Sequence, residues 1–108
     1  MRVLIADKLA SHVASSLREQ GHDVRLEPSL KEDSLAEMLA EFLPEVLVVR
    51  STKVGANHIR DTASLELVIR AGAGVNTIDL NTASQLGIFV ANCPGKNAVA
   101  VAELASAF

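Results

Sequence analysis

The sequence has little of several features that would place a protein in a specialised class. It holds one cysteine in 108 residues, so no disulfide can form within the chain and a reducing compartment, the cytoplasm, is expected. It has no block of basic residues and a net charge of −3, which argues against nucleic acid or an anionic membrane as the main partner. A signal peptide is not expected because Asp7 interrupts the first apolar run, and no apolar stretch is long enough to span a membrane. This composition favours one cytoplasmic globular domain.

Charged side chains are scarce in the last third of the chain. Residues 71–108 contain only three of them, Asp79, Lys96 and Glu103. Three charges are too few to cover the solvent-facing surface of a monomer. This stretch therefore either forms the centre of the domain or is covered by something else.

Short apolar runs alternate with amphipathic segments along the chain. They predict strands at 3–6, 23–27, 46–49, 65–69 and 88–91, and helices at 9–20, 34–43, 57–62, 77–86 and from 97 onward. Continuous apolar runs are typical of strands buried on both faces of a parallel sheet, whereas the alternation in 23–27 is typical of an edge strand. The order implies βαβ units with right-handed crossovers. We expect a flavodoxin-like, doubly wound α/β fold with five parallel strands in the order 2-1-3-4-5.

Local signals predict where several helices begin and end. Gly21 and Gly87 follow helical segments and are expected to end them, as Pro44 ends the second helix. Ser34 and Glu37 have the spacing of a capping box, which predicts that the second helix starts at Ser34.

In such a sheet, ligands bind beyond the carboxyl ends of the strands. The pattern places Asp7, residues 50–52, the loop 71–76 and the turn 92–96 there. Arg50 follows a strand without charge, so its guanidinium suits a carboxylate or phosphate, and Ser51 adds a hydroxyl donor. Taken alone, an ion pair at the surface explains Arg50 equally well.

The loop 72–76, with the sequence GAGVN, allows the backbone to approach an anion closely and to turn its amides inward. It matches a dinucleotide-binding fingerprint only in part, since Thr77 occupies the third small position and no acidic residue follows about 20 positions later. By itself it is better explained as a tight turn between strand and helix. No lysine follows as in a P-loop.

No cluster of catalytic or metal-binding groups is recognisable. His12 and His58 fall in predicted helices and His22 at a turn, none with acidic or cysteine neighbours at ligand spacing, so surface roles are expected for all three. Cys93 has no partner cysteine or nearby histidine and is expected to be an inert thiol. The residues thus offer groups that hold an anion, but no acid, base or nucleophile.

Several segments together resemble those of the D-isomer-specific 2-hydroxyacid dehydrogenases, and most of all the phosphoglycerate-type members. They are Val48–Lys53, Ile69–Leu80, Gly87–Asn97 and Val101–Leu104, and the resemblance runs from Met1 to Phe108 without a gap. It implies that residues 1–97 are the flavodoxin-like substrate-binding domain, without the family's carboxy-terminal completing segment. Residues 98–108 would be the start of an unfinished interdomain helix.

The resemblance also implies roles for individual residues. Arg50 and Ser51 would contact the acidic end of a small anionic 2-hydroxy acid such as 3-phosphoglycerate, and Arg70 stands where phosphoglycerate-type members often carry another arginine. The substrate carboxylate would be held by the loop formed by Gly72, Ala73, Gly74, Val75 and Asn76. Ala73 and Val101 would lie near the cofactor, NAD.

In the family, the Rossmann fingerprint and the catalytic residues lie in a second domain that would begin after Phe108. The resemblance therefore implies a fragment of an NAD-dependent oxidoreductase of serine biosynthesis, with no catalytic residue, no metal site and no bound NAD of its own. This fragment is expected to be inactive alone.

Two features leave other interpretations open. In Ala98–Phe108 only Glu103 and Ser106 are polar, so this predicted helix must be buried. We expect a homodimer that buries it, in which the two copies could exchange structural elements. A self-associating module without enzymatic role is thus an alternative. A signalling receiver shares the fold and an acid after the first strand, Asp7, but it would need an aspartate where this chain has Arg50.

Overall fold

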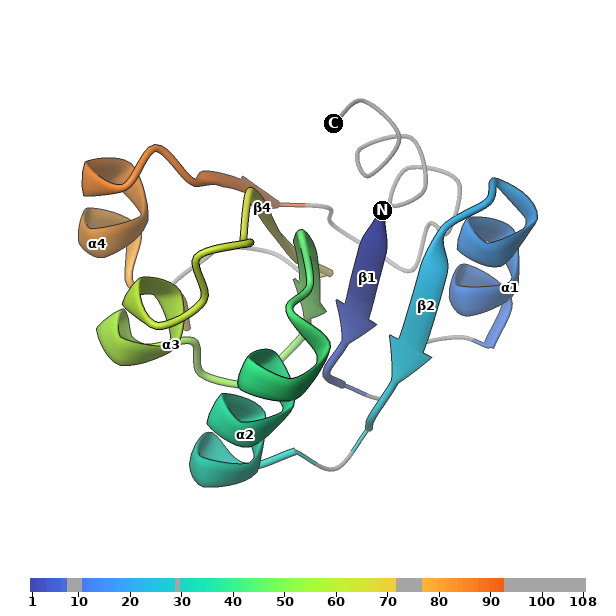
Figure 1. Ribbon diagram of the computed structural model, residues 1–108, viewed down its shortest axis with the longest axis horizontal. Coiled ribbons are helices and arrows are strands. Elements are labelled where there is room, and N and C mark those ends of the chain that lie inside the picture. The colour runs from blue at the N-terminus through green and yellow to red at the C-terminus, as the bar shows by residue number, and fades with distance from the viewer. Residues whose placement is uncertain (8–10, 29, 72–76, 93–108) are drawn as a thin grey trace.

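The computed structural model describes residues 1–7, 11–28, 30–71 and 77–92, and within them the chain forms a parallel sheet flanked by helices (Figure 1). The elements are β1 (Arg2–Ile5), α1 (Ser11–Glu19), β2 (Asp23–Leu26), α2 (Glu32–Phe42), β3 (Val46–Val49), α3 (Ala56–Arg60), β4 (Leu67–Arg70), α4 (Leu80–Gln85) and β5 (Phe89–Asn92). The strand order is β2-β1-β3-β4-β5 and every pairing is parallel, which confirms the predicted doubly wound α/β fold. The helix predicted from residue 97 lies outside the described residues.

The sheet separates two apolar layers. On one face, Val3 and Ile5 of β1 pack with α1 through Val13 and Leu17. On the other face, Leu4 packs with α2, α3 and α4, which lie together in Figure 1. The buried residues of these helices include Leu35, Leu39, Ile59 and Ala83. Side chains of a strand alternate between the two faces, so a strand covered on both sides must be apolar throughout.

Burial separates the central strands from the edges. All four residues of β3 are buried, as their uninterrupted apolar run predicts. β2 lies at one edge, as predicted from its alternation, and buries only Val24. β5 lies at the other edge, where Phe89 is 64% exposed. Among the described residues, no helix is long and apolar enough to cross a membrane.

The predicted start of α2 at Ser34 is wrong. The helix begins at Glu32 with Lys31 as its N-cap, and Ser34 is the third helical residue. The Ser34 hydroxyl Oγ accepts a hydrogen bond from the Lys31 backbone N–H at 2.8 Å and donates to the Lys31 carbonyl at 3.2 Å. Ser34 thus caps the first turn from the third helical position instead of from the N-cap position. Glu32 and Asp33 lie at the positive end of the helix dipole, where acidic residues are stabilising.

The predicted helix over 77–86 is shorter in the structure. α4 begins at Leu80 because Asp79 is its N-cap, and the Asp79 carboxylate accepts the Thr82 backbone N–H at 3.0 Å. The residue before it, Ile78, is extended and forms an isolated parallel bridge with Val54. Positive φ angles at Gly21 and Gly87 agree with the predicted helix ends, since glycine adopts this region without strain.

Candidate functional site

The end of β1 is joined to the segment that follows β3 by a single carboxylate. The Oδ2 atom of Asp7 accepts three backbone N–H groups in succession, from Arg50 at 2.6 Å, Ser51 at 3.0 Å and Thr52 at 3.0 Å. Its Oδ1 atom accepts the Thr52 hydroxyl at 2.8 Å. β1 and β3 are neighbours in the sheet, which is why residues 43 to 45 positions apart meet here. We call this arrangement the Asp7 anchor.

The electrostatics of the anchor favour the ionised carboxylate. Asp7 is only 9% exposed, and burial by itself raises the pKa of its carboxyl group. The hydrogen bonds from the backbones of Arg50 and Thr52, from the Thr52 hydroxyl and from the Ser51 backbone act in the other direction and leave the pKa of Asp7 below its ordinary value. The anchor is therefore a charged group that is held by dipoles at neutral pH.

The anchor leaves two of the three polar side chains of the segment, those of Arg50 and Ser51, at the surface. The backbone N–H groups of Arg50 and Ser51 point to Asp7, while both residues are exposed. A guanidinium and a hydroxyl on a segment held by four hydrogen bonds are suited to bind an anion, because less ordering is needed on binding.

The register of the sheet brings a second arginine to the same edge. Arg70 is the last residue of β4 and is paired with Val49, the residue just before Arg50, on one side and with Asn92 on the other. Arg70 is half-buried, in contrast to the exposed Arg50. The structure thus places Arg50, Ser51 and Arg70 at the carboxyl edge. The sequence pattern predicted this position for Arg50 and Ser51, and the family resemblance singled out Arg70.

The remaining predicted site residues lie outside the described residues. They are Gly72, Ala73, Gly74, Val75 and Asn76 of the loop, and Val101 of the last helix. Their roles stay predictions.

The expected surface role of His58 is wrong. His58 is 6% exposed and both of its ring nitrogens have partners. Nδ1 accepts the Gly55 backbone N–H at 3.0 Å, so Nε2 carries the hydrogen and donates it to the Glu32 carbonyl at 2.9 Å. The imidazole thereby joins the beginning of α3 to the beginning of α2. His22 is half-buried, and burial, followed by the positive charge of the N-terminus, lowers its pKa.

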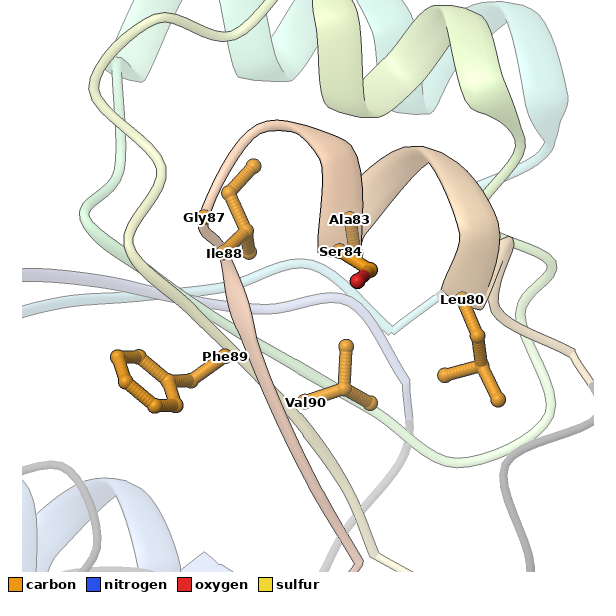
Figure 2. Close-up of a pocket in the computed structure, with 7 residues that line it drawn as sticks. All are labelled: Leu80, Ala83, Ser84, Gly87, Ile88, Phe89 and Val90. Atoms are coloured by element: carbon orange, nitrogen blue, oxygen red, sulfur yellow. The ribbon is translucent and has the colours of Figure 1, made fainter.

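A hollow of about 420 Å³ lies apart from this edge, between α4 and β5. Figure 2 shows the residues that line it, which are Leu80, Ala83, Ser84, Gly87, Ile88, Phe89 and Val90. Ser84 supplies the single polar side chain of this lining and no member is charged. The hollow is therefore unsuited to a small anion.

Thr52 is the residue whose role sequence reasoning missed. The sequence pattern places Thr52 at the carboxyl edge with Arg50 and Ser51, but only the folded chain shows that its hydroxyl and its backbone N–H both bind Asp7. An aspartate that directly follows a buried apolar run, here Val3–Ala6, is the signal that points to such a contact, because its charge must be satisfied locally. In the described part of the chain, no group of three or more His, Cys, Asp or Glu residues is arranged to hold a metal ion.

The doubly wound sheet and the two arginines at its carboxyl edge define an α/β domain suited to small anionic ligands. The family model described as "D-isomer specific 2-hydroxyacid dehydrogenase, catalytic domain" matches residues 3–107, so the chain belongs to this family.

Named relatives agree with this assignment. The chain is 37% identical over 108 residues to D-3-phosphoglycerate dehydrogenase of Archaeoglobus fulgidus, covering 99% of this chain and 20% of that protein. It is 38% identical over 105 residues to hydroxypyruvate reductase of Thermotoga maritima, covering 96% of this chain and 34% of that protein. The chain thus spans about a fifth of the first of these relatives and a third of the second.

A solved structure with the same fold is the NAD+-bound 3-phosphoglycerate dehydrogenase of Entamoeba histolytica. The TM-score is 0.76 at 29% identity, covering 99% of this chain and 37% of that one. The receiver alternative finds no support, since the chain belongs to a dehydrogenase family and Asp7 is engaged with the 50–52 segment.

Proposed function

We propose that this chain is the substrate-binding part of an NAD-dependent dehydrogenase that acts on a small anionic 2-hydroxy acid such as 3-phosphoglycerate. The observation that carries the proposal is the exposed Arg50, borne on a segment that the Asp7 anchor holds at the carboxyl edge of the sheet. Similarity to phosphoglycerate dehydrogenases and to a hydroxypyruvate reductase supports the substrate class. Both names refer to small acids with oxygen on the second carbon.

Individual roles follow from this proposal. Arg50 and Ser51 bind the acidic end of the substrate, and the neighbouring strand adds the positive charge of Arg70. Backbone amides of the loop 72–76 bind the substrate carboxylate. NAD is the cofactor of the whole enzyme, with Ala73 and Val101 nearest to it, and we assign no catalytic residue within these 108 residues.

The two arginines favour a substrate with two acidic groups. A guanidinium forms paired hydrogen bonds with phosphate as well as with carboxylate. 3-Phosphoglycerate carries one group of each kind, whereas glycerate carries only the carboxylate. We therefore propose the phosphorylated acid as the preferred ligand, and serine biosynthesis in the cytoplasm as the setting.

Titration of the chain with 3-phosphoglycerate, followed by NMR of backbone amides and arginine side chains, tests the proposal. We expect saturable shifts at Arg50 and Ser51, and affinity for D-glycerate at least about tenfold lower, because one charged hydrogen-bonded pair contributes about 1.5–3 kcal/mol. Arg50→Ala is expected to abolish the shifts, while Arg60→Ala, which removes an exposed arginine of α3, leaves them unchanged. Equal binding by wild type and Arg50→Ala would overturn the proposed function.

We also propose a domain organisation and an oligomeric state. Residues 1–97 form the substrate-binding domain and 98–108 begin the connection to a further domain. The apolar sequence of Ala98–Phe108 requires a partner surface, and a homodimer through this segment supplies one. A monomer at micromolar concentration by light scattering would contradict the homodimer without affecting the substrate proposal.

A further inference from the structure

We propose that Asp7 is a positioning residue of the anion site, which holds residues 50–52 so that the Arg50 side chain, and not the backbone of that segment, faces the ligand. This inference rests on the proposed function, because it assigns a role to Asp7 toward the same ligand. It adds that the affinity of the site depends on a carboxylate that does not touch the ligand.

The geometry of the anchor supports this role. Three consecutive N–H groups that converge on one point form a concave anion site of the kind that binds phosphate or carboxylate. Here the point of convergence is occupied by the Oδ2 atom of Asp7, at 2.6 Å from the Arg50 nitrogen and 3.0 Å from those of Ser51 and Thr52. The chain thus supplies its own anion to these amides, and a ligand cannot use them.

The charges support it as well. Among the described residues, the hydrogen bonds to Asp7 come from three backbone N–H groups and the Thr52 hydroxyl, and none comes from the Arg50 guanidinium. In the described part of the chain, the exposed guanidinium thus gives none of its donors to Asp7, while its backbone is fixed. Without the carboxylate, the three amides would lose their acceptor, and the segment would have to change its course or take an anion from solution.

This last consequence gives a direct test by chemical rescue. Asp7→Ala removes the carboxylate and leaves space for a formate ion at the same amides. We expect Asp7→Ala to bind 3-phosphoglycerate at least tenfold more weakly than wild type and to regain at least half of this loss, on a logarithmic scale, in formate. The amides of 50–52 should exchange with solvent at least tenfold faster in the variant and slow down again with formate. Chloride at equal ionic strength serves as the salt control.

A matched variant separates positioning from a general loss of stability. The Glu45 side chain is also a carboxylate that accepts a backbone N–H, that of Arg2 at 3.1 Å, but it lies at the amino edge of the sheet. Glu45→Gln is expected to leave both 3-phosphoglycerate affinity and exchange at 50–52 unchanged. If Asp7→Ala does not fold, Asp7→Asn takes its place, because the amide keeps the shape and one oxygen while it removes the charge. For this variant we expect a loss of at least threefold in affinity and faster exchange, without rescue.

The outcomes distinguish this inference from the proposed function. If the wild-type chain does not bind 3-phosphoglycerate, or if Arg50→Ala binds it equally well, the proposed function fails. Amide hydrogen exchange at residues 50–52, and its slowing by formate in Asp7→Ala, then still decides whether Asp7 positions the segment. If a folded Asp7 variant binds the ligand like wild type and exchanges at the wild-type rate, the positioning role is overturned.

Discussion

Two buried polar side chains, Asp7 and His58, solve the same structural problem in different ways. Each is less than 10% exposed, and each joins two segments by hydrogen bonds to backbone groups. Asp7 does so as an anion with three N–H groups and a hydroxyl, His58 as a neutral ring with one N–H and one carbonyl. The Asp7 anchor fixes a segment that carries an exposed arginine, whereas His58 fixes the beginnings of two helices. Burial and hydrogen bonding alone therefore do not distinguish a functional group from a structural one. The distinction depends on which side chains the fixed segment exposes to solvent.

The two contacts should also differ in their contribution to stability. Hydrogen bonds to a charged group contribute about 1.5–3 kcal/mol each and those between neutral groups about 0.5–1.5 kcal/mol. Asp7 has four hydrogen bonds of the first kind and His58 two of the second. The contributions are not additive, because the exposed 50–52 segment can regain water when the carboxylate is lost.

The largest expected effect is therefore that of Asp7→Ala on the free energy of unfolding. We expect a loss of about 3 kcal/mol, because three N–H groups and a hydroxyl lose one charged acceptor. Urea unfolding followed by circular dichroism measures it. Glu45→Gln, which affects a single 3.1 Å hydrogen bond of a carboxylate, should cost less than about 1 kcal/mol. Equal losses in the two variants would contradict the special status of the anchor.

His58→Ala is expected to cost about 2 kcal/mol, from two neutral hydrogen bonds and the space left by a buried ring. Unlike Asp7→Ala, it should leave the 3-phosphoglycerate affinity of the folded chain unchanged. Urea unfolding and ligand titration on the same sample test both statements. A loss of affinity as large as that of Asp7→Ala would remove the functional difference between the two side chains.

The pH dependence of stability should distinguish the charged contact from its neutral counterpart. Since folding lowers the pKa of Asp7, its contribution is complete above the ordinary aspartate value of about 3.9 and is lost as pH falls through the lower pKa of the folded state. Wild type should thus be more stable than Asp7→Asn at pH 7, by about 1–2 kcal/mol, because hydrogen bonds from the three N–H groups to a neutral amide are weaker than those to a carboxylate. This gap should narrow below about pH 4 as the carboxyl group becomes protonated. A gap that is constant down to pH 2 would show that the charge of Asp7 contributes nothing.

Much of the fold was predictable because strands and helices alternate with clear apolar patterns. The strand order and the placement of Arg50 at the carboxyl edge follow from these patterns alone, whereas Arg70 was singled out only by the family resemblance. Helix starts were less predictable, because Ser34 can close a turn either as N-cap or as third residue, and only the folded backbone decides.

The two buried side chains were not predictable in the same way. The Asp7 anchor joins residues more than 40 positions apart, and its four distances depend on how the β1 and β3 ends lie beside each other. His58 lies in a five-residue helix, which is too short to show an apolar period, so the pattern gave no sign of its burial. Sequence reasoning places groups at an edge; contacts between distant segments require the structure.

The smallest expected effect comes from a second aspartate, Asp79, whose ordinary helix cap serves as the reference for the Asp7 anchor. Asp79 caps α4 by accepting one hydrogen bond at its Oδ1 atom from the Thr82 backbone N–H, at 3.0 Å, and it is only partly buried. Asp79→Ala should cost about 1 kcal/mol, the usual effect of losing an N-cap, and Asp79→Asn less than that, because asparagine is an equally good cap. At position 7 the alanine variant should again lose more unfolding free energy than the asparagine variant. Asp7→Asn should nevertheless remain clearly destabilised, since three N–H groups there depend on the negative charge. Urea unfolding of the four variants tests this; equal tolerance of asparagine at positions 7 and 79 would mean that the anchor is an ordinary cap and that its negative charge has no special role.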